Sequence, residues 1–204
     1  MKIYETALTR VLFAATDRGP SRFDLKYIKC NMDGSAEATN GRVFVKVFEH
    51  HEGLEGTIYI DFEKVANLPK KGELSLGMQE DNIISSKFIF PCKRTTAWPN
   101  TERFIPHLTT LSCFTSVCIG LSTLKVLKEV CQLQPSYAPF WAGKPDQANG
   151  TCILIHPIPN LLVVGLSDNK DNYIEESAAY HTYMQQRGKN TAKNNKFLFF
   201  LLTF

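Results

Sequence analysis

The chain has 204 residues, of which 44% are hydrophobic and 21% are charged, and its formal net charge is +3. These proportions exclude a globally disordered chain and leave room for two ordinary domains or for several modules of about 50 residues each. No stretch reaches the ~20 apolar residues of a membrane-spanning helix, and residues 1–20 lack the pattern of a secretory signal, so we expect a cytoplasmic protein with no membrane contact.

The first predicted module opens with a helix over residues 3–16. Apolar side chains recur there at the spacing of one helical face, at Ile3, Ala7, Leu8, Val11, Leu12 and Ala15. Thr6, Thr9 and Arg10 fall on the opposite side and are expected to face outward. Gly19 and Pro20 then end the helix.

Strands complete this first module. Residues 23–31 and 41–48 alternate in side-chain character, which is typical of strands. Between them we predict a turn at Asp33 and Gly34, followed by a short strand.

The second module repeats this order of elements. Residues 57–60 read as a strand and residues 61–68 as a short helix, with Asp61 at the N-cap and Pro69 ending it. Further strands are predicted over residues 73–79, 82–86 and 87–93, with a turn at residues 80–82.

A third module contains the clearest helix, over residues 121–133. Its apolar stripe is predicted to be Leu121, Leu124, Leu127 and Cys131, while Ser122, Lys125, Lys128 and Glu129 face outward. Strands are expected at residues 116–119, 150–157 and 160–168. The recurrence predicts an α+β fold of repeated modules, with helices on one face of antiparallel sheets.

Three segments, in order, resemble the bacterial sliding clamp, the β subunit of the replicative DNA polymerase. AEATNGRVFV at residues 36–45 and WPNTERFIP at residues 98–106 are similar to two motifs of a clamp domain, and IYIDFEKVANL fills the interval between them. Two departures are that Gly41 runs directly into Arg42, without the family's His, and that Trp98 replaces the usual Phe.

The resemblance implies the domain organisation and the repeated βαβββ modules. Residues 1–106 would form a complete clamp-like domain, residues 107–172 a partial second domain, and residues 173–204 a tail of uncertain structure. We expect the apolar end of this tail, residues 197–204, to be buried, either as an edge strand or in the groove of a neighbouring copy.

The resemblance also implies two binding surfaces. A groove for peptides of DNA polymerase and other clamp-binding proteins would be lined by Thr39, Gly41, Arg42, Val43, Pro99, Arg103 and Phe104. Duplex DNA would be held without sequence preference by basic residues on and near the helices, namely Arg10, Arg22, Lys64, Lys125 and Lys128. Self-association into a ring or partial ring is expected, because an incomplete second domain leaves an edge strand open.

Catalytic, metal and cofactor sites are not predicted. The six cysteines form no C-x-x-C pair, so we interpret them as reduced structural thiols and discount zinc at Cys113, Cys118 and Cys131. The adjacent His50 and His51 are interpreted as a solvated strand end.

Two other functions stay open. The chain could be an adaptor or decoy that keeps the peptide groove without forming a ring, or an unrelated α+β enzyme whose site assembles only in three dimensions.

Overall fold

The computed structural model describes residues 1–63, 67–104, 121–133, 140–143, 152–158 and 160–166. For residues 103–104, 140–143, 152–158 and 166 it describes the course of the backbone alone. One compact unit comprises Met1–Ser167, and the other, Asp168–Phe204, lies outside the described residues. The expectations for the strand at residues 116–119, for Lys64 and for the tail therefore also fall outside them.

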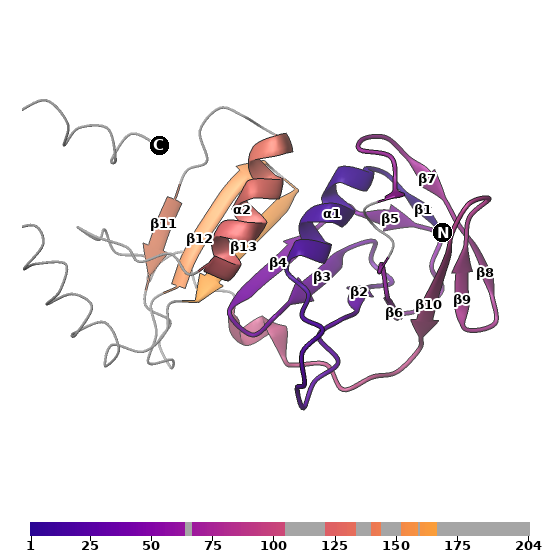
Figure 1. The fold of residues 1–204 in the computed structure, drawn as a ribbon, viewed down its shortest axis with the longest axis horizontal. Coiled ribbons are helices and arrows are strands. Elements are labelled where there is room, and N and C mark those ends of the chain that lie inside the picture. Colours follow the sequence, from indigo (N-terminus) through magenta and orange to yellow (C-terminus); the bar gives the residue numbers. More distant parts are fainter. Residues whose placement is uncertain (64–66, 105–120, 134–139, 144–151, 159, 167–204) are drawn as a thin grey trace, which may run out of the picture. The chain divides into compact units, whose positions relative to one another are not determined.

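Short antiparallel strands make up most of the first unit. In chain order they are β1 (Lys2–Ile3), β2 (Ile28–Cys30), β3 (Ala36–Thr39), β4 (Val43–Val47), β5 (His51–Glu52), β6 (Ile58–Ile60), β7 (Leu74–Ser75), β8 (Gly77–Gln79), β9 (Asn82–Ile84), β10 (Ile89–Lys93), β11 (Phe140–Gly143), β12 (Cys152–Ile158) and β13 (Leu161–Leu166). Among the described residues they form a ten-stranded sheet of order β11-β12-β13-β4-β3-β2-β6-β10-β9-β8 and a three-stranded sheet of order β5-β1-β7 (Figure 1).

Helices α1 (Thr6–Ala14) and α2 (Leu121–Leu133) pack side by side on the same face of the large sheet (Figure 1). A shorter 3-10 helix, η2, spans Thr101–Phe104. One continuous apolar core joins the two helices to the sheet, with Val11 of α1, Val126 of α2 and Val163 of β13 among its members. The predicted α+β fold, with antiparallel sheets and helices on one face, is confirmed.

The sheet runs without a break across the predicted domain boundary at residue 106. Strand β13 pairs with β4 in antiparallel register, with Leu161 opposite Val47 and Gly165 opposite Val43. Strand β4 pairs in turn with β3, so the two predicted domains share one sheet through this pairing. The division into domains itself stays a prediction.

Helix α1 is buried on more sides than its sequence pattern predicts. It begins at Thr6 rather than near Ile3, which belongs to β1, and the Glu5 carboxylate accepts a hydrogen bond from the Ala7 amide as its N-cap. The expectation that Thr6 and Thr9 face outward is wrong, because both are 0% exposed. Their hydroxyls can be buried because each has a hydrogen-bond partner, the Pro69 carbonyl for Thr6 at 2.8 Å and the His50 ring for Thr9 at 2.9 Å.

The predicted turns of the first and second modules are confirmed. At the first, the Asp33 carboxylate accepts hydrogen bonds from the Ser35 amide and hydroxyl, and Gly34 has a φ of +86°. A Cβ at Gly34 would lie 2.7 Å from the His51 carbonyl oxygen, so both the backbone angle and the close approach require glycine. At the second, Glu80 takes a φ of 52° between β8 and β9.

The second module forms strands in its predicted regions, but the strand predicted over residues 73–79 is divided into β7 and β8, which belong to different sheets. The helix predicted over residues 61–68 falls partly on residues 64–66, outside the description. Asp61, predicted as that helix's N-cap, has a buried carboxylate that pairs with Arg18 and, at 3.7 Å, with Lys26. The Asp61 side chain thus links the segment that follows α1 to the end of strand β6.

Helix α2 has the predicted bounds but turns a different face to the core. Leu121 and Leu124 are 85% and 46% exposed and Cys131 is also exposed, so the predicted stripe is wrong except at Leu127. The buried side chains are Thr123, Val126, Leu127 and Val130. Gly165 permits this orientation, because a Cβ there would lie 2.9 Å from the Thr123 side chain. Thr123 therefore occupies the space that the glycine leaves on β13.

Two further expectations need correction. The pair His50 and His51 is not a solvated strand end, because the two residues are 0% and 2% exposed. Strand β11, which covers Phe140–Gly143, has no counterpart in the sequence prediction, which takes that region as a connection. Among the helices in the described part of the chain, none combines the length and apolar character needed to cross a bilayer.

Candidate functional site

The first clamp-like motif forms the tip of the β3–β4 hairpin. The Asn40 side-chain oxygen accepts hydrogen bonds at 2.9 Å from the amides of both Arg42 and Val43. The Thr39 hydroxyl donates to the Val43 carbonyl at 2.8 Å and accepts from the Gly41 amide at 3.1 Å. Gly41 has a φ of +84°, with open space where a Cβ would be, so the backbone angle is what calls for glycine here.

This tip separates one exposed residue from one buried residue. Arg42 is exposed at the end of the hairpin, whereas Val43 is 0% exposed and belongs to the core. Thr39 is buried as well, with 1% exposure. Of the predicted groove residues on this hairpin, Gly41 and Arg42 thus lie at the surface, while Thr39 and Val43 support them from below.

The second motif contains the 3-10 helix η2. Its Pro99 is partly exposed, and the Trp98 ring lies 5.7 Å from the Tyr59 ring, between centroids. Arg103 and Phe104 are the last residues of η2, and their side chains lie outside the described parts. The motif thus packs on β6 through an aromatic contact, while its Pro99 stays accessible.

Glu37 connects the two motifs through Thr101, which lies 64 positions further along the chain. The Thr101 hydroxyl of η2 donates a hydrogen bond of 2.8 Å to the Glu37 carboxylate on β3. The same carboxylate lies 3.5 Å from the Lys29 ammonium and 3.1 Å from that of Lys46. Lys29 and Lys46 are its direct neighbours on β2 and β4, so sheet register places one cation on each side of the acid.

The charge on Glu37 is retained despite burial. Glu37 is 5% exposed, and burial alone raises the pKa of its carboxyl. The Thr101 hydrogen bond and the Lys29 and Lys46 ammonium groups outweigh that effect, so the pKa is lowered from its ordinary value. The sequence analysis did not identify Glu37; its one signal was an acid in the middle of an otherwise small and apolar strand, flanked in register by two lysines.

The predicted DNA-binding residues lie on different elements and differ in exposure. Lys125 and Lys128 are exposed on α2, and Arg22 is exposed in the connection after α1, where its guanidinium lies 4.7 Å from the centroid of the Phe23 ring. Arg10 on α1 is half-buried, and its guanidinium donates to the Leu68 carbonyl. Lys64 lies outside the described residues.

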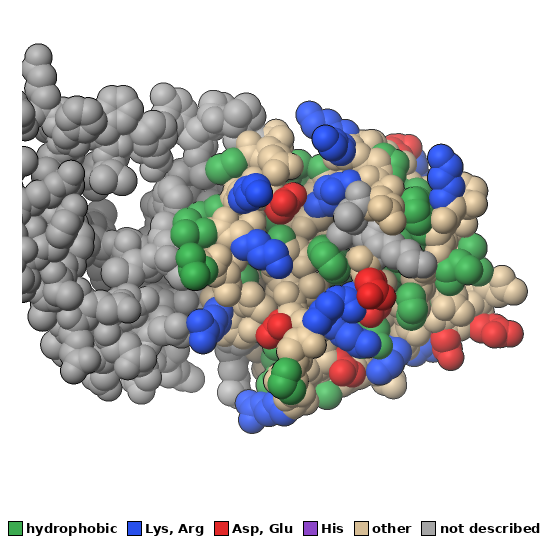
Figure 2. Space-filling model, viewed as in Figure 1, with side chains coloured by type: hydrophobic (Ala, Val, Ile, Leu, Met, Phe, Trp, Pro, Cys, Tyr) green, Lys and Arg blue, Asp and Glu red, His purple; other side chains and the backbone are tan. Residues whose placement is uncertain are grey.

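The face that carries both helices is nevertheless rich in basic side chains. Figure 2 shows Lys and Arg side chains spread over this face, with hydrophobic and a few acidic side chains between them. Such a distribution suits loose contact with phosphates better than a single deep site does. Away from the hairpin tip, the buried residues Cys30, His50 and His51 form the group in the described chain that could hold a metal ion.

Comparisons with known proteins agree on the fold. No protein-family model matches the sequence, and neither does any curated protein. Among solved structures, the DNA polymerase III β subunit of Thermotoga maritima is 11% identical with a TM-score of 0.51, and the match covers 84% of this chain and 66% of that one.

Two other sliding clamps are similar. The DNA polymerase III β subunit of Pseudomonas aeruginosa is 10% identical with a TM-score of 0.49, covering 83% of this chain and 66% of that one. The sliding clamp of Caulobacter crescentus is 12% identical with a TM-score of 0.47, covering 84% and 67%. Together with the topology, the Thermotoga structure shows that the chain has the sliding-clamp fold, which confirms the resemblance at that level, and the chain spans 66% of that subunit's length.

Proposed function

We propose that the chain is a clamp-like processivity factor of the cytoplasm, which binds duplex DNA without sequence preference and recruits replication proteins through a peptide groove, without catalysing a reaction. The observation that carries this proposal is the bond between Glu37 and Thr101. It joins the two motifs that resemble a clamp's groove, in a chain that has the clamp's fold.

The groove would lie between the hairpin tip and η2. Exposed Arg42 and partly exposed Pro99 are the described residues that support an accessible surface there. The resemblance to clamps adds Arg103 and Phe104 to this surface. Arg103 would pair with a peptide carboxylate, and Phe104 would contact an apolar side chain of the peptide. Burying one Leu and one Phe of a peptide contributes about 1.5 to 3 kcal/mol each before ordering costs, so the affinity should be modest.

Support for DNA binding comes from the face formed by α1 and α2. Helices that present Lys and Arg to a duplex hold it through phosphates, which gives affinity that depends on salt and not on sequence. Lys125 and Lys128 fit this role, because both are exposed and stand one turn apart on α2. Arg10 is a weaker candidate, since its guanidinium already bonds the Leu68 carbonyl.

Assembly into a ring or partial ring is part of the proposal. Strands β8 and β11 are the outermost strands of the large sheet in the described part of the chain, and β8 is exposed along its length. Light scattering after size-exclusion chromatography should show a dimer or larger species whose proportion rises with concentration. A monomer at every concentration would remove the ring from the proposal.

One observation favours the alternative of an adaptor that forms no ring. Leu121 and Leu124 are exposed on α2, on the helix that would face the DNA. Apolar side chains gain nothing from a phosphate backbone and suit a protein partner better. Peptide binding without any duplex binding would select this alternative.

The test uses fluorescence anisotropy with two probes, a labelled peptide ending in Leu-Phe and a labelled duplex. Arg103→Ala should weaken the peptide about tenfold and leave the duplex unchanged, because one charge-assisted hydrogen bond is lost. Lys125→Ala is the matched control, and it should leave peptide binding unchanged while weakening the duplex. At a peptide concentration near 1 mM, a binding free energy of only about 4 kcal/mol is enough to detect the complex. Absence of binding at that concentration would refute the assignment of the groove.

A further inference from the structure

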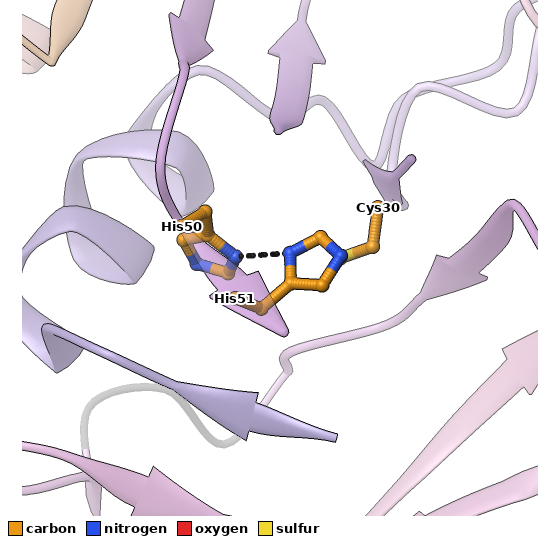
Figure 3. A group of neighbouring side chains, drawn as sticks. All are labelled: Cys30, His50 and His51. Atoms are coloured by element: carbon orange, nitrogen blue, oxygen red, sulfur yellow. Dashed lines mark hydrogen bonds between the residues drawn. The ribbon is translucent and has the colours of Figure 1, made fainter. Parts of the chain in front are cut away.

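Cys30, His50 and His51 form a buried cluster between the two sheets. Cys30 ends β2, while His50 and His51 stand at the start of β5. Their exposed fractions are 0%, 0% and 2%. The Cys30 sulfur and one ring nitrogen from each histidine lie within 4.8 Å of one another, and in Figure 3 the Cys30 side chain points toward the His51 ring.

Hydrogen bonds define the state of both rings without an ion. His51 Nε2 lies 3.0 Å from the Asn31 carbonyl oxygen, which can only accept, so this nitrogen carries a proton. His51 Nδ1 is then an acceptor, and His50 Nδ1, 3.1 Å away, must donate to it (Figure 3). His50 Nε2 is left to accept from the Thr9 hydroxyl at 2.9 Å.

Both imidazoles are therefore neutral, and each has one lone pair, which accepts a hydrogen bond in the absence of an ion. Burial lowers the pKa of His50 to about 3 and lowers that of His51 as well, so neither ring carries a charge at neutral pH. A neutral imidazole is the form that binds transition metals. One hydrogen bond joins the two rings, which are buried from solvent, and the Cys30 thiol lies near them.

We propose that Cys30, His50 and His51 bind one soft cation, Zn²⁺ or Cu⁺, in place of the proton shared by the two rings. One sulfur and two imidazole nitrogens are ligands that both ions prefer. No other His, Cys, Asp or Glu among the described residues joins the group. Three protein ligands match the trigonal geometry of copper sites with a Cys and two His, whereas Zn²⁺ would need a further ligand.

The surrounding bonds fit such an ion. Ligating histidines usually hold their other nitrogen on a carbonyl or a similar group, and here the Asn31 carbonyl and the Thr9 hydroxyl serve the two rings. Zinc takes imidazole nitrogen at ~2.0–2.1 Å and thiolate sulfur at ~2.3 Å. The two Nδ1 atoms, 3.1 Å apart, would therefore separate by a few tenths of an ångström to about 3.3–3.6 Å, while the Cys30 sulfur would move toward the ion.

Protons balance in the binding step. The Cys30 thiol loses its proton to solvent and its sulfur bonds the ion. His50 stays neutral but changes tautomer, with its ring proton on Nε2 instead of Nδ1, and this N–H donates a hydrogen bond to Thr9 Oγ1, reversing the direction of the bond present without the ion. One proton is thus released for each ion, and affinity should rise with pH.

The backbone holds both histidines in place for this role. The Gly34 carbonyl accepts hydrogen bonds from the amides of His50, at 2.9 Å, and His51, at 3.1 Å. Since Gly34 is fixed by its positive φ in the turn after β2, the same turn positions Cys30 and both rings. Backbone hydrogen bonds thus hold the residues of the cluster together without an ion.

Metal content after refolding tests the proposal, because a dry site takes up its ion as the chain folds. The full chain is refolded with Zn²⁺, with Cu⁺ under anaerobic conditions, or with Co²⁺ as a spectroscopic probe, and is then dialysed and measured for bound metal. The wild type should hold about one equivalent of Zn²⁺ or Cu⁺, and the Co²⁺ form should show a thiolate charge-transfer band. The refolding condition that leaves more metal bound after dialysis identifies the preferred ion.

Matched variants assign the ligand. Cys30→Ala should reduce the bound metal to below about a tenth of an equivalent and abolish the cobalt band, whereas Cys131→Ala, at an exposed thiol on α2, should change neither. If Cys30→Ala does not fold, a chain with Cys30 as its single cysteine should still show the band. Absence of metal from the wild type, metal retained in folded Cys30→Ala, or loss of the band from the single-cysteine chain would each overturn the proposal.

Discussion

The helices α1 and α2 lie side by side on one face of the same sheet, yet the surrounding structure holds them differently. Every residue of α1 except Arg10 and Phe13 is buried, and the Thr6 and Arg10 side chains bond to the carbonyls of Pro69 and Leu68. In α2 the buried residues are Thr123, Val126, Leu127 and Val130, while leucines and lysines are exposed along its other side.

This difference favours α2 over α1 as the helix that would carry the proposed contacts. The basic residue of α1 is committed to the Leu68 carbonyl, and its threonines are committed to Pro69 and His50. The lysines of α2 are exposed in the described part of the chain, so a binding partner can reach them. Equivalent places in a repeated fold therefore need not have equivalent roles.

Truncating one leucine in each helix should give the largest contrast. Leu12 is 0% exposed, so Leu12→Ala should lower the free energy of unfolding by about 2–5 kcal/mol. Leu124 is 46% exposed, and Leu124→Ala should change it by no more than about 0.5 kcal/mol. Urea denaturation measures both, and equal losses would mean that α2 is covered and that the comparison is mistaken.

A substitution at Gly165 tests how closely α2 packs on β13. Gly165→Ala places a Cβ 2.9 Å from the Thr123 side chain, and because the core is tightly packed it should cost about 1–3 kcal/mol. Gly165→Ala combined with Thr123→Ser should recover part of that loss, since the smaller side chain relieves the contact. Thermal unfolding measures both proteins, and a neutral Gly165→Ala would show that α2 does not depend on this approach.

Acid should lower the stability of the part of the sheet under α1, because that part contains the buried Glu37. Its pKa is lowered in the folded chain, so the stabilisation is present above the ordinary carboxyl pKa and is lost as pH falls through the folded value. Glu37→Gln should destabilise the protein by about 1–2 kcal/mol at pH 7 and flatten this acid dependence. Glu129→Gln on α2 is the control; an unchanged acid profile in Glu37→Gln would contradict the role given to the cluster.

Local patterns predicted most of the elements. The bounds of α2 agree with its sequence pattern, and the turns at Asp33 and at Glu80 follow from turn chemistry that needs no tertiary information. The face that α2 buries could not be predicted, because it depends on Gly165 in another strand. Leucine spacing alone favoured the wrong side.

The candidate site divides in the same way. Its two motifs were identified by their resemblance to clamps, but the residue that joins them, Glu37, was not. Its partners Lys29, Lys46 and Thr101 come from other segments and meet it through sheet register. The burial of His50 was missed for the same reason, since its hydrogen-bond partner Thr9 lies on α1.

The salt dependence of duplex binding tests the central claim most directly, because that claim is that exposed lysines of α2 contact phosphates. Fluorescence anisotropy would measure the affinity of wild type and of the double variant Lys125→Ala and Lys128→Ala across a range of salt concentrations. The account predicts that the variant binds more weakly and that its slope of log affinity against log salt is smaller by about 2, one for each lost phosphate contact. Identical slopes for the two proteins, or no duplex binding by the wild type at low salt, would contradict it.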